Sequence, residues 1–470
     1  QNRVETTQPE GNIVRWQYDE RDLPLSYTRG FGNPAASTVT FNLYDGSGNL
    51  LKSRDAEDHN GDLLGDPVTR TYDGYDRLMT LKDAVGGILE RHYDANGNPT
   101  SEKRFGQIGG PSPVDDSGAG NVLLSETQMA YDQADRVSQT DRVLFVSTGV
   151  TPTRPVTLQD GPLTPGDLKV STRMDYDRLG RLRYRTEDDL DRYRNDYDGA
   201  SRLLKAIDAV GNENLQGYDD NGNLVRVSRT EKHPEGQVAN QAFVSVTRYD
   251  ALNRPVRANT TLGHARRMAY DSRNNLTQMT DAQAGLGSET ETTTSLVTLN
   301  VPGNKTQHFY DGLNRLRKTV RTLTSNGQGD GTPSGTIMTL QDFDRNDRLV
   351  SQTDDRGKVT SYLYDALNRK TKDLFHDGTF TEVQLYDKDD NVRLLRDARG
   401  IVRTTIPDSL NRPMSCSVAL GGSGAVGTTL QAWEFDGLGR ATRTTDNNDP
   451  LLASDDSAVT CFYDALSRKL

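Results

Sequence analysis

Hydrophobic and polar residues alternate over short stretches of this sequence, and residues that favour tight turns separate the stretches. The segment from Lys358 to Tyr364 is typical, with β-branched and aromatic residues set among polar ones. No stretch sustains the i, i+3, i+4, i+7 spacing of an amphipathic helix. The pattern therefore predicts an all-β chain of short strands joined by tight turns.

A Tyr-Asp dipeptide recurs along the chain and defines a repeat. It stands at 14 registered positions, Phe-Asp replaces it at two and Pro-Asp at one, which gives 17 units. Their first residues are Tyr18, Tyr44, Tyr72, Tyr93, Tyr131, Tyr176, Tyr197, Tyr218, Tyr249, Tyr270, Tyr310, Phe343, Tyr364, Tyr386, Pro407, Phe435 and Tyr463. The spacing is 21 residues six times and rises to 45 elsewhere. We therefore take 21 residues as the basic unit and the excess as insertions.

Other columns of the repeat specify turns. Four residues after the aromatic, every unit has Gly, Asn, Asp or Ser, as at Gly180, Asn253 and Ser467. These residue types tolerate a positive φ, which closes a short hairpin connection. An Asp and a Gly three residues later, such as Asp354 and Gly357, predict a second turn. One unit is thus predicted to be two strands and two turns.

The position after the turn column is Arg in eleven units and Asn in five. In stacked strands about 4.8 Å apart, these arginines are expected to stack on tyrosine rings or to pair with the Asp column. Such packing gives the residue at every recurrent position a structural role that needs no ligand. Seventeen units give about 34 strands, enough for a large arc or about one turn of a wide spiral.

The composition agrees with a thin wall better than with a compact globule. Only 33% of residues are hydrophobic, and the mean hydropathy is -0.75. A globule of this length is expected to bury a larger apolar fraction. The 19 tyrosines, spread along the chain, also argue against disorder.

Charge and hydropathy exclude several kinds of partner. The net charge of -11 argues against binding to nucleic acid or an anionic membrane. An apolar run such as Val143–Val146 is far too short to span a membrane. The N-terminus shows no signal peptide. Two cysteines, Cys416 and Cys461, make neither a disulfide framework nor a zinc site.

No motif predicts catalysis, a cofactor site or a metal site. The histidines His59, His92, His233, His264, His308 and His376 are scattered, and no His-Glu-x-x-His, Gly-x-Ser-x-Gly or Walker sequence occurs. We therefore expect no enzyme activity. The best metal candidate is the acidic segment 55–66, but with Gly61 in the sixth position of a calcium loop, the first position is Ala56. An ordinary turn is favoured there, and calcium is the alternative.

The repeat resembles the YD or RHS repeat family. Copies of its motif include Tyr93–Pro99 and Tyr310–Leu316, and the resemblance runs from Tyr18 to the end of the chain. The family includes bacterial Rhs toxins, Tc-toxin cocoon components, wall-associated proteins and teneurins. The resemblance implies an antiparallel β-hairpin array, a single sheet that spirals around a hollow as part of a shell or barrel. In the toxins the cocoon encloses a toxic segment, and in teneurins the barrel is an adhesion scaffold.

We accordingly expect a structural shell segment that encapsulates or displays a toxin or other polypeptide cargo. Its partners would be that cargo or the remainder of a larger YD-repeat protein, and it would be exported from a bacterium, secreted or held at the cell surface. The alternative is an extracellular adhesion or carbohydrate-binding module that binds a cell-surface protein or glycan.

Residues 1–470 are expected to form one continuous array. The sequence stops in mid-unit after Arg468, which predicts a fragment of a longer shell. Stretches rich in Gly, Pro, Ser and Thr predict insertion loops at 106–121, 147–167, 230–242, 282–306, 322–338 and 417–429.

Overall fold

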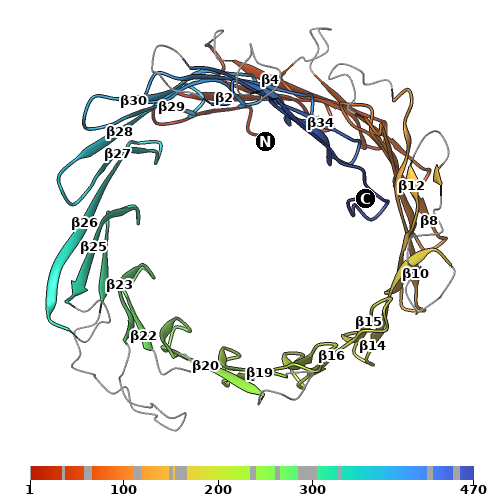
Figure 1. Cartoon of the computed structure of the whole chain (residues 1–470), viewed down its shortest axis with the longest axis horizontal. Coiled ribbons are helices and arrows are strands. Elements are labelled where there is room, and N and C mark those ends of the chain that lie inside the picture. The colour runs from red at the N-terminus through yellow and green to blue at the C-terminus, as the bar shows by residue number, and fades with distance from the viewer. Residues whose placement is uncertain are drawn as a thin grey trace.

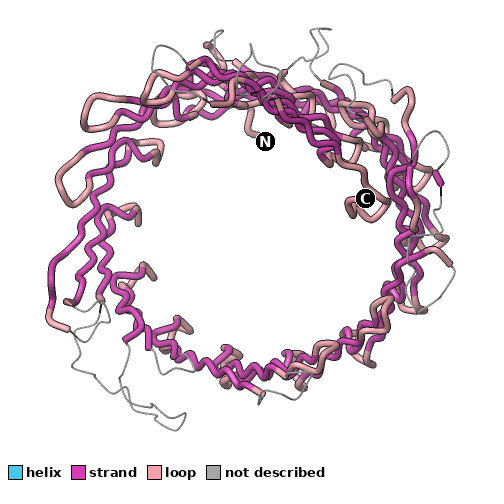
Figure 2. Tube along the Cα trace, in the orientation of Figure 1, coloured by secondary structure: helices cyan, strands magenta, loops and turns pink. Residues whose placement is uncertain are grey.

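The structure of the chain is a computed structural model that describes most of its residues. The described residues are 2–33, 37–57, 66–109, 118–147, 152–153, 167–232, 240–259, 265–283, 304–325, 331–420, 427–447 and 456–470. Within these ranges the chain is all β and contains no helix (Figure 2). No helix among them is therefore long and apolar enough to cross a membrane.

The strands are short and follow one another closely. The first eighteen are β1 Glu5–Thr7, β2 Ile13–Tyr18, β3 Pro24–Arg29, β4 Thr38–Tyr44, β5 Leu50–Arg54, β6 Pro67–Tyr72, β7 Leu78–Lys82, β8 Ile88–Tyr93, β9 Pro99–Gly106, β10 Val122–Tyr131, β11 Val137–Val143, β12 Val146–Ser147, β13 Pro152–Thr153, β14 Lys169–Tyr176, β15 Leu182–Thr186, β16 Arg192–Tyr197, β17 Leu203–Ile207 and β18 Glu213–Tyr218. The others are β19 Leu224–Glu231, β20 Gln241–Tyr249, β21 Pro255–Asn259, β22 Ala265–Tyr270, β23 Leu276–Gln283, β24 Lys305–Tyr310, β25 Leu316–Thr324, β26 Pro333–Phe343, β27 Leu349–Thr353, β28 Val359–Tyr364, β29 Lys370–Leu374, β30 Phe380–Tyr386, β31 Val392–Arg396, β32 Val402–Pro407, β33 Pro413–Ala419, β34 Leu430–Phe435, β35 Ala441–Asn447 and β36 Ser457–Thr460.

Almost all strands belong to one antiparallel sheet. The sheet has 34 strands, and β12 and β13 form a separate pair. Each strand of the large sheet pairs with its neighbours in chain order, and β14 follows β11 directly. The two ends of the order, β1 and β36, each pair on one side only. The predicted fold, a single sheet of antiparallel hairpins, is confirmed.

The predicted turn chemistry creates these hairpins. All 17 residues of the column four after the aromatic have a positive φ, from Asp22 at 66° to Ser467 at 63°. In the turn after Tyr176, the Asp177 N–H donates to the Arg181 carbonyl and the Gly180 N–H donates to the Asp177 carbonyl. The pairing register shifts by one residue at Tyr176 itself. The left-handed residue therefore closes the turn that the sequence predicts.

The sheet curls into a ring whose two ends overlap. Figure 1 shows the ribbon running round an open centre, with β29 and β30 of the last third lying beside β2 and β4 of the first. Hydrogen bonds between residues 320 to 361 positions apart in the sequence join the two ends. We call this line of contact, between residues 8–146 and residues 345–465, the seam.

Burial is concentrated along the seam. The core cluster consists of Val143, Phe145 and Ala465, with Leu123 packed against it. Ala84 and Val85, in a turn of the first circuit, are also buried. Elsewhere most residues are half-buried or exposed, which agrees with the low apolar content of the sequence.

The predicted insertions fall largely on residues outside the described ranges. This applies to parts of 106–121, 147–167, 230–242, 282–306, 322–338 and 417–429. In 322–338, the described flanks are strand: β25 and β26 stay paired out to Thr324 and Pro333. That insertion therefore begins as an extension of a hairpin.

Candidate functional site

The side chains of the repeat link each hairpin to the next. In the unit that begins at Tyr176, the Arg181 Nε donates to Asp177 Oδ2 at 2.7 Å and its Nη1 donates to the Asp198 carbonyl at 2.8 Å. The same guanidinium lies 4.7 Å from the centre of the Tyr197 ring. The Tyr197 hydroxyl donates back to the carbonyl of Leu182 at 3.0 Å. The arginine thus donates to the next unit, and the tyrosine of that unit donates back to the first.

These links recur along the whole array. All eleven column arginines donate to the Asp of their own unit at 2.5–2.8 Å. Ten of them stack on the aromatic residue of the next unit, at 4.4–5.2 Å from the ring centre. All 14 repeat tyrosines donate their hydroxyl to a backbone carbonyl. The expected stacking and pairing of the Arg column are both present.

These contacts lower the pKa of turn aspartates such as Asp177 and Asp219. In every unit, the Oδ1 of the repeat Asp accepts the N–H of the residue four positions later. The Arg181 side chain, followed by its N–H, lowers the pKa of Asp177 below the ordinary value. In a unit with Asn, the side chain of Asn223 and then its N–H lower the pKa of Asp219. Such carboxylates are poor proton donors at neutral pH.

At the seam, repeat units contact parts of the chain that are far away in the sequence, in addition to the adjacent units. Turns that follow the repeat aromatics in the second circuit rest on turns at the opposite edge of the first. The Glu10 N–H donates to Asn346 Oδ1 at 2.9 Å, and the Arg345 N–H donates to Glu10 Oε1 at 3.3 Å. Asn12 also hydrogen-bonds to the Ala366 carbonyl.

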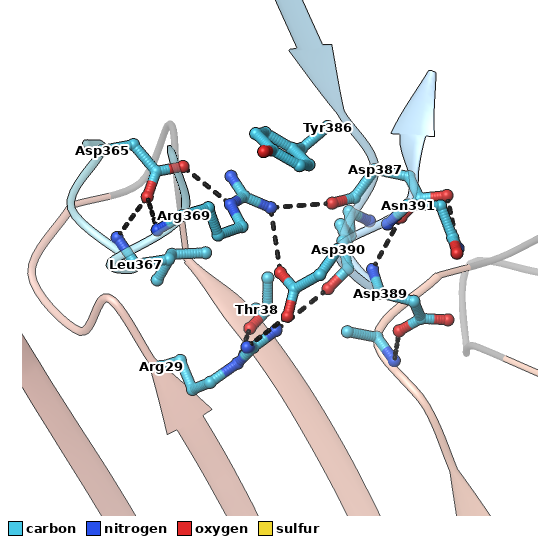
Figure 3. Close-up of polar contacts among 12 residues, drawn as sticks. Arg29, Thr38, Asp365, Leu367, Arg369, Tyr386, Asp387, Asp389, Asp390 and Asn391 are labelled. Atoms are coloured by element: carbon cyan, nitrogen blue, oxygen red, sulfur yellow. Dashed lines mark hydrogen bonds and ion pairs between the residues drawn. The ribbon is translucent and has the colours of Figure 1, made fainter. Parts of the chain in front are cut away.

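In the middle of the seam, the turn between β30 and β31 is clamped from two sides (Figure 3). Arg29 of the first circuit donates to Asp390 Oδ2 at 2.6 Å, and Arg369 donates to Asp390 Oδ1 at 3.1 Å. Arg369 simultaneously pairs with Asp365 at 2.7 Å and lies 4.4 Å from the Tyr386 ring. The arginine that links two units therefore also contacts the residue that crosses the seam.

Towards its far end the seam becomes a close backbone contact. The Gly437 N–H donates to the Gln107 carbonyl at 3.0 Å, and the Ala465 N–H donates to the Phe145 carbonyl at 2.9 Å. The repeat aspartates in these two turns, Asp436 and Asp464, are 2% and 1% exposed. The second circuit thus buries its turns on the first.

Two carboxyl groups face each other across the seam. Burial, followed by the charge of Asp389, raises the pKa of Asp55 to about 7. Burial also raises the pKa of Asp389 above its ordinary value. Asp389 Oδ1 accepts the Ala56 N–H at 3.2 Å, and Glu57 Oε2 accepts the Lys388 N–H at 2.7 Å. No sequence column marks Asp55 and Asp389 as a pair.

The proposed calcium segment is only partly visible. Asp55, Ala56, Glu57 and Asp66 are described, and positions 58–65 lie outside the described residues. The described part of the chain contains no group of three His, Cys, Asp or Glu side chains arranged to hold a metal ion. Within the described part, Asp55 Oδ1 accepts the Asp66 N–H at 2.9 Å.

Other residues singled out in the sequence stay apart. His92 hydrogen-bonds to Glu90 at 2.8 Å and His308 to Thr319 at 3.3 Å. His59, His233 and His264 lie outside the described residues. Cys416 and Cys461 are free thiols.

A shallow groove of about 510 Å³ crosses strands β15 to β20 on one face of the sheet. Tyr193 and Phe243 line it, with the side chains of Asn195, Asn214 and Arg229. The Oδ1 of Asn214 is buried and accepts no hydrogen bond from the described residues. Sequence reasoning gave no signal for this groove, because cross-strand neighbours such as Asn214 and Arg229 are brought together only by the register.

The repeat itself identifies the family. The sequence pattern described as RHS Repeat matches residues 249–285 and 343–373. These two segments are RHS repeats. The two matched segments cover the hairpins from Tyr249 and from Phe343, and the positive φ of their turn residues recurs in the other units. A comparison with curated proteins finds no match.

Among solved structures, similarity extends over the whole chain at low identity. TcdB2-TccC3-TEV is 13% identical, with a TM-score of 0.46, over 98% of this chain and 26% of that one. TcdB2-TccC3 without its hypervariable C-terminal region is 11% identical, with a TM-score of 0.36, over 99% and 34%. The Tc holotoxin pore of Photorhabdus luminescens with a mutated TccC3 is 10% identical, with a TM-score of 0.30, over 100% and 34%. The chain thus spans about a quarter to a third of the length of these structures.

Proposed function

We propose that this chain is a wall segment of a hollow RHS-repeat shell that encapsulates or displays polypeptide cargo. The observation that carries the proposal is the seam. A sheet that curls past one full circuit and rests on its own first strands forms a wall around a space, which an open arc would not do. In this role the protein is exported and works as part of a larger RHS-repeat polypeptide.

The contacts of the repeat support a structural role without catalysis. Among the described residues, the recurrent Asp, Arg and Tyr side chains bond to the backbone, to each other or to a neighbouring unit, as Asp250, Arg254 and Tyr270 do. A catalytic acid or base needs a side chain placed to exchange protons with a substrate. The recurrent residues are instead occupied in holding the sheet together.

Protease protection tests enclosure. The full gene product that contains this array would be digested with trypsin, and surviving fragments would be identified by mass spectrometry. A shell predicts that cargo survives beside the intact array. It also predicts that the cargo is degraded faster when the seam is disturbed by Gly437→Ala. Gly199→Ala, at the same repeat position away from the seam, is the control. Degradation of all non-array segments at one rate in the three proteins would contradict enclosure.

The groove over β15–β20 favours a second candidate, a carbohydrate-binding module. Two aromatic rings with amide and guanidinium groups between them offer both stacking and hydrogen bonds to a sugar. A glycan array would test it with the wild-type chain and the variants Tyr193→Ala and Asn214→Ala. Binding that both variants lose would support this function, and an array with no binder would reject it.

A further inference from the structure

The seam joins two different edges of the wall. Turns that follow the repeat aromatics, such as 177–181, form one edge, which we call the aromatic-turn edge. The Asp-x-x-Gly turns and their equivalents, such as 83–87 and 208–212, form the other, which we call the glycine-turn edge. In the seam, the aromatic turn that contains Asn346 lies on the glycine turn that contains Glu10. From β14 to β25 the described strands make a single circuit, so both edges are open there (Figure 1).

Two copies of one glycine turn show what the seam does to this edge. The sequence Asp-Ala-Val-Gly begins at Asp83, inside the seam, and again at Asp208, on the open part of the edge. Val85 in the first copy is 4% exposed, whereas Val210 in the second copy is 57% exposed. Burial raises the pKa of Asp83, and the charge of Arg412 from the second circuit lowers it. Val210 therefore exposes an apolar surface that its counterpart buries in the seam.

The neighbouring glycine turn exposes a second apolar side chain, in an unfavourable backbone conformation. Leu190 stands where the Asp208 turn has Gly211, with φ +69° and 54% of the residue exposed. The turn fixes this conformation, because the Leu190 N–H donates to the Glu187 carbonyl. A left-handed conformation is costly for a residue with a Cβ, and glycine would avoid the cost. An exposed leucine in this place indicates a contact made outside the chain.

The aromatic-turn edge shows the same contrast at its leucines, which often stand three residues after the repeat aromatic. In units of the seam these leucines are half-buried, and they are Leu367, Leu410, Leu438 and Leu466. In units away from the seam they are 66–70% exposed, and they are Leu179, Leu252 and Leu313. One half of the seam interface is therefore repeated along this edge without a covering circuit.

The two open edges also complement each other in charge. On the glycine-turn edge, Asp189 and Asp191 flank Leu190 and are exposed. On the aromatic-turn edge, Arg178 stands beside Leu179 and is exposed. Both halves of a contact of the seam type are thus open on one chain. A second copy of the chain presents to each open edge the half that it lacks.

We propose that copies of this chain stack edge to edge, with the aromatic-turn edge of one copy on the glycine-turn edge of the next. The contact joins two different surfaces, so a dimer still has one free edge of each kind and further copies can add. This inference goes beyond enclosure, because stacked copies would lengthen the wall whatever it surrounds.

Sedimentation velocity on the intact chain tests the stacking. The wild type should sediment faster as its concentration rises. The double variant Leu190→Gly/Val210→Asp blocks the glycine-turn edge and should associate at least about tenfold more weakly. It should fold, because Asp189 holds the position of Val210 in the neighbouring turn. Leu190→Gly alone should weaken association and yet raise the thermal midpoint, since it relieves the left-handed leucine.

A second variant blocks the other edge. Leu179→Asn/Leu252→Asn/Leu313→Asn places at the aromatic-turn edge the residue type that Asn221 already provides at the same repeat position. Alone, it should associate as weakly as the first double variant. An equimolar mixture of the two blocked proteins should form dimers and nothing larger, because each supplies the intact edge that the other lacks. Leu215→Asp, at an exposed leucine within β18, is the control and should associate like the wild type.

Three results would overturn the stacking. One is a wild type that stays monomeric at every concentration, which decides the matter even if a variant folds poorly. Another is a mixture of the two blocked proteins that remains monomeric. The third is a monomeric full gene product in which the amides of 208–212 are as protected from hydrogen exchange as those of 83–87. A flanking circuit of the same polypeptide would then occupy the edge in place of a second copy.

Discussion

At the scale of single residues, every column of the repeat solves a backbone or hydrogen-bonding problem. The left-handed residue turns the chain, and the Asp satisfies N–H groups that the turn leaves open. The Arg side chain then links that Asp to the next unit. Arg202, for example, donates hydrogen bonds to the Asp198 carboxylate and to the Asp219 carbonyl. These tasks need only local geometry, which explains why the sequence alone predicts all 17 turns.

The requirement for a positive φ can be tested at a glycine with free space around it. Gly357 has φ +76° and no atom within 4 Å of an added Cβ. Gly357→Ala should cost about 1–2 kcal/mol, because only backbone strain opposes it. Gly312→Ala is the matched control, since Gly312 also has open space but no positive φ. Thermal unfolding of both variants checks the expectation, and equal midpoints would contradict it.

At the scale of hairpins, the tyrosine hydroxyl fixes the position of each unit against the one before. For 12 of the 14 repeat tyrosines, the carbonyl that accepts it belongs to the residue just after the column arginine or asparagine in the earlier unit, such as Leu349 for Tyr364. Two units have Phe in place of Tyr and keep the stacking: the Phe343 ring lies 5.2 Å from Arg315. Ring and hydroxyl therefore make separable contributions.

Reciprocal substitutions measure the hydroxyl alone. Tyr364→Phe should lower the free energy of unfolding by about 0.5–1.5 kcal/mol, because the Leu349 carbonyl loses its donor. Phe343→Tyr should not destabilise and is placed to gain the equivalent bond to Leu316. Urea unfolding of the two variants and the wild type gives both numbers. Destabilisation of similar size by both substitutions would mean that packing of the ring matters and the hydrogen bond does not.

At the scale of the whole molecule, the seam is the feature that the sequence did not reveal. The repeat predicts how each unit pairs with the next, but the curvature of the sheet and the lengths of the insertions decide which units meet after a full circuit. Arg29, Glu57 and Asp389 belong to no conspicuous column, and they meet across 331 to 361 residues. Neither this offset nor the raised pKa of Asp55 could be read from local patterns.

Two glycines at the same repeat position, one at the seam and one away from it, allow the contribution of the seam to stability to be measured. Gly437 and Gly199 both stand two residues after the repeat aromatic. A Cβ on Gly437 would lie 2.5 Å from the Gly106 Cα, whereas a Cβ on Gly199 meets nothing within 4 Å. Gly437→Ala should therefore cost about 1–3 kcal/mol by forcing the circuits apart. Gly199→Ala should change stability by less than about 0.5 kcal/mol.

Exchange measurements show whether that cost falls on the seam. In Gly437→Ala, amide protection should drop at Gly437 and Ala465, whose N–H groups donate across the seam, and stay unchanged in β15–β20, which the seam does not touch. A drop spread evenly over the sheet would mean that the variant weakens the hairpin itself. Because the repeat position is the same in both variants, only contact between circuits distinguishes them. A selective loss would therefore establish that the last strands of the wall rest on the first in solution.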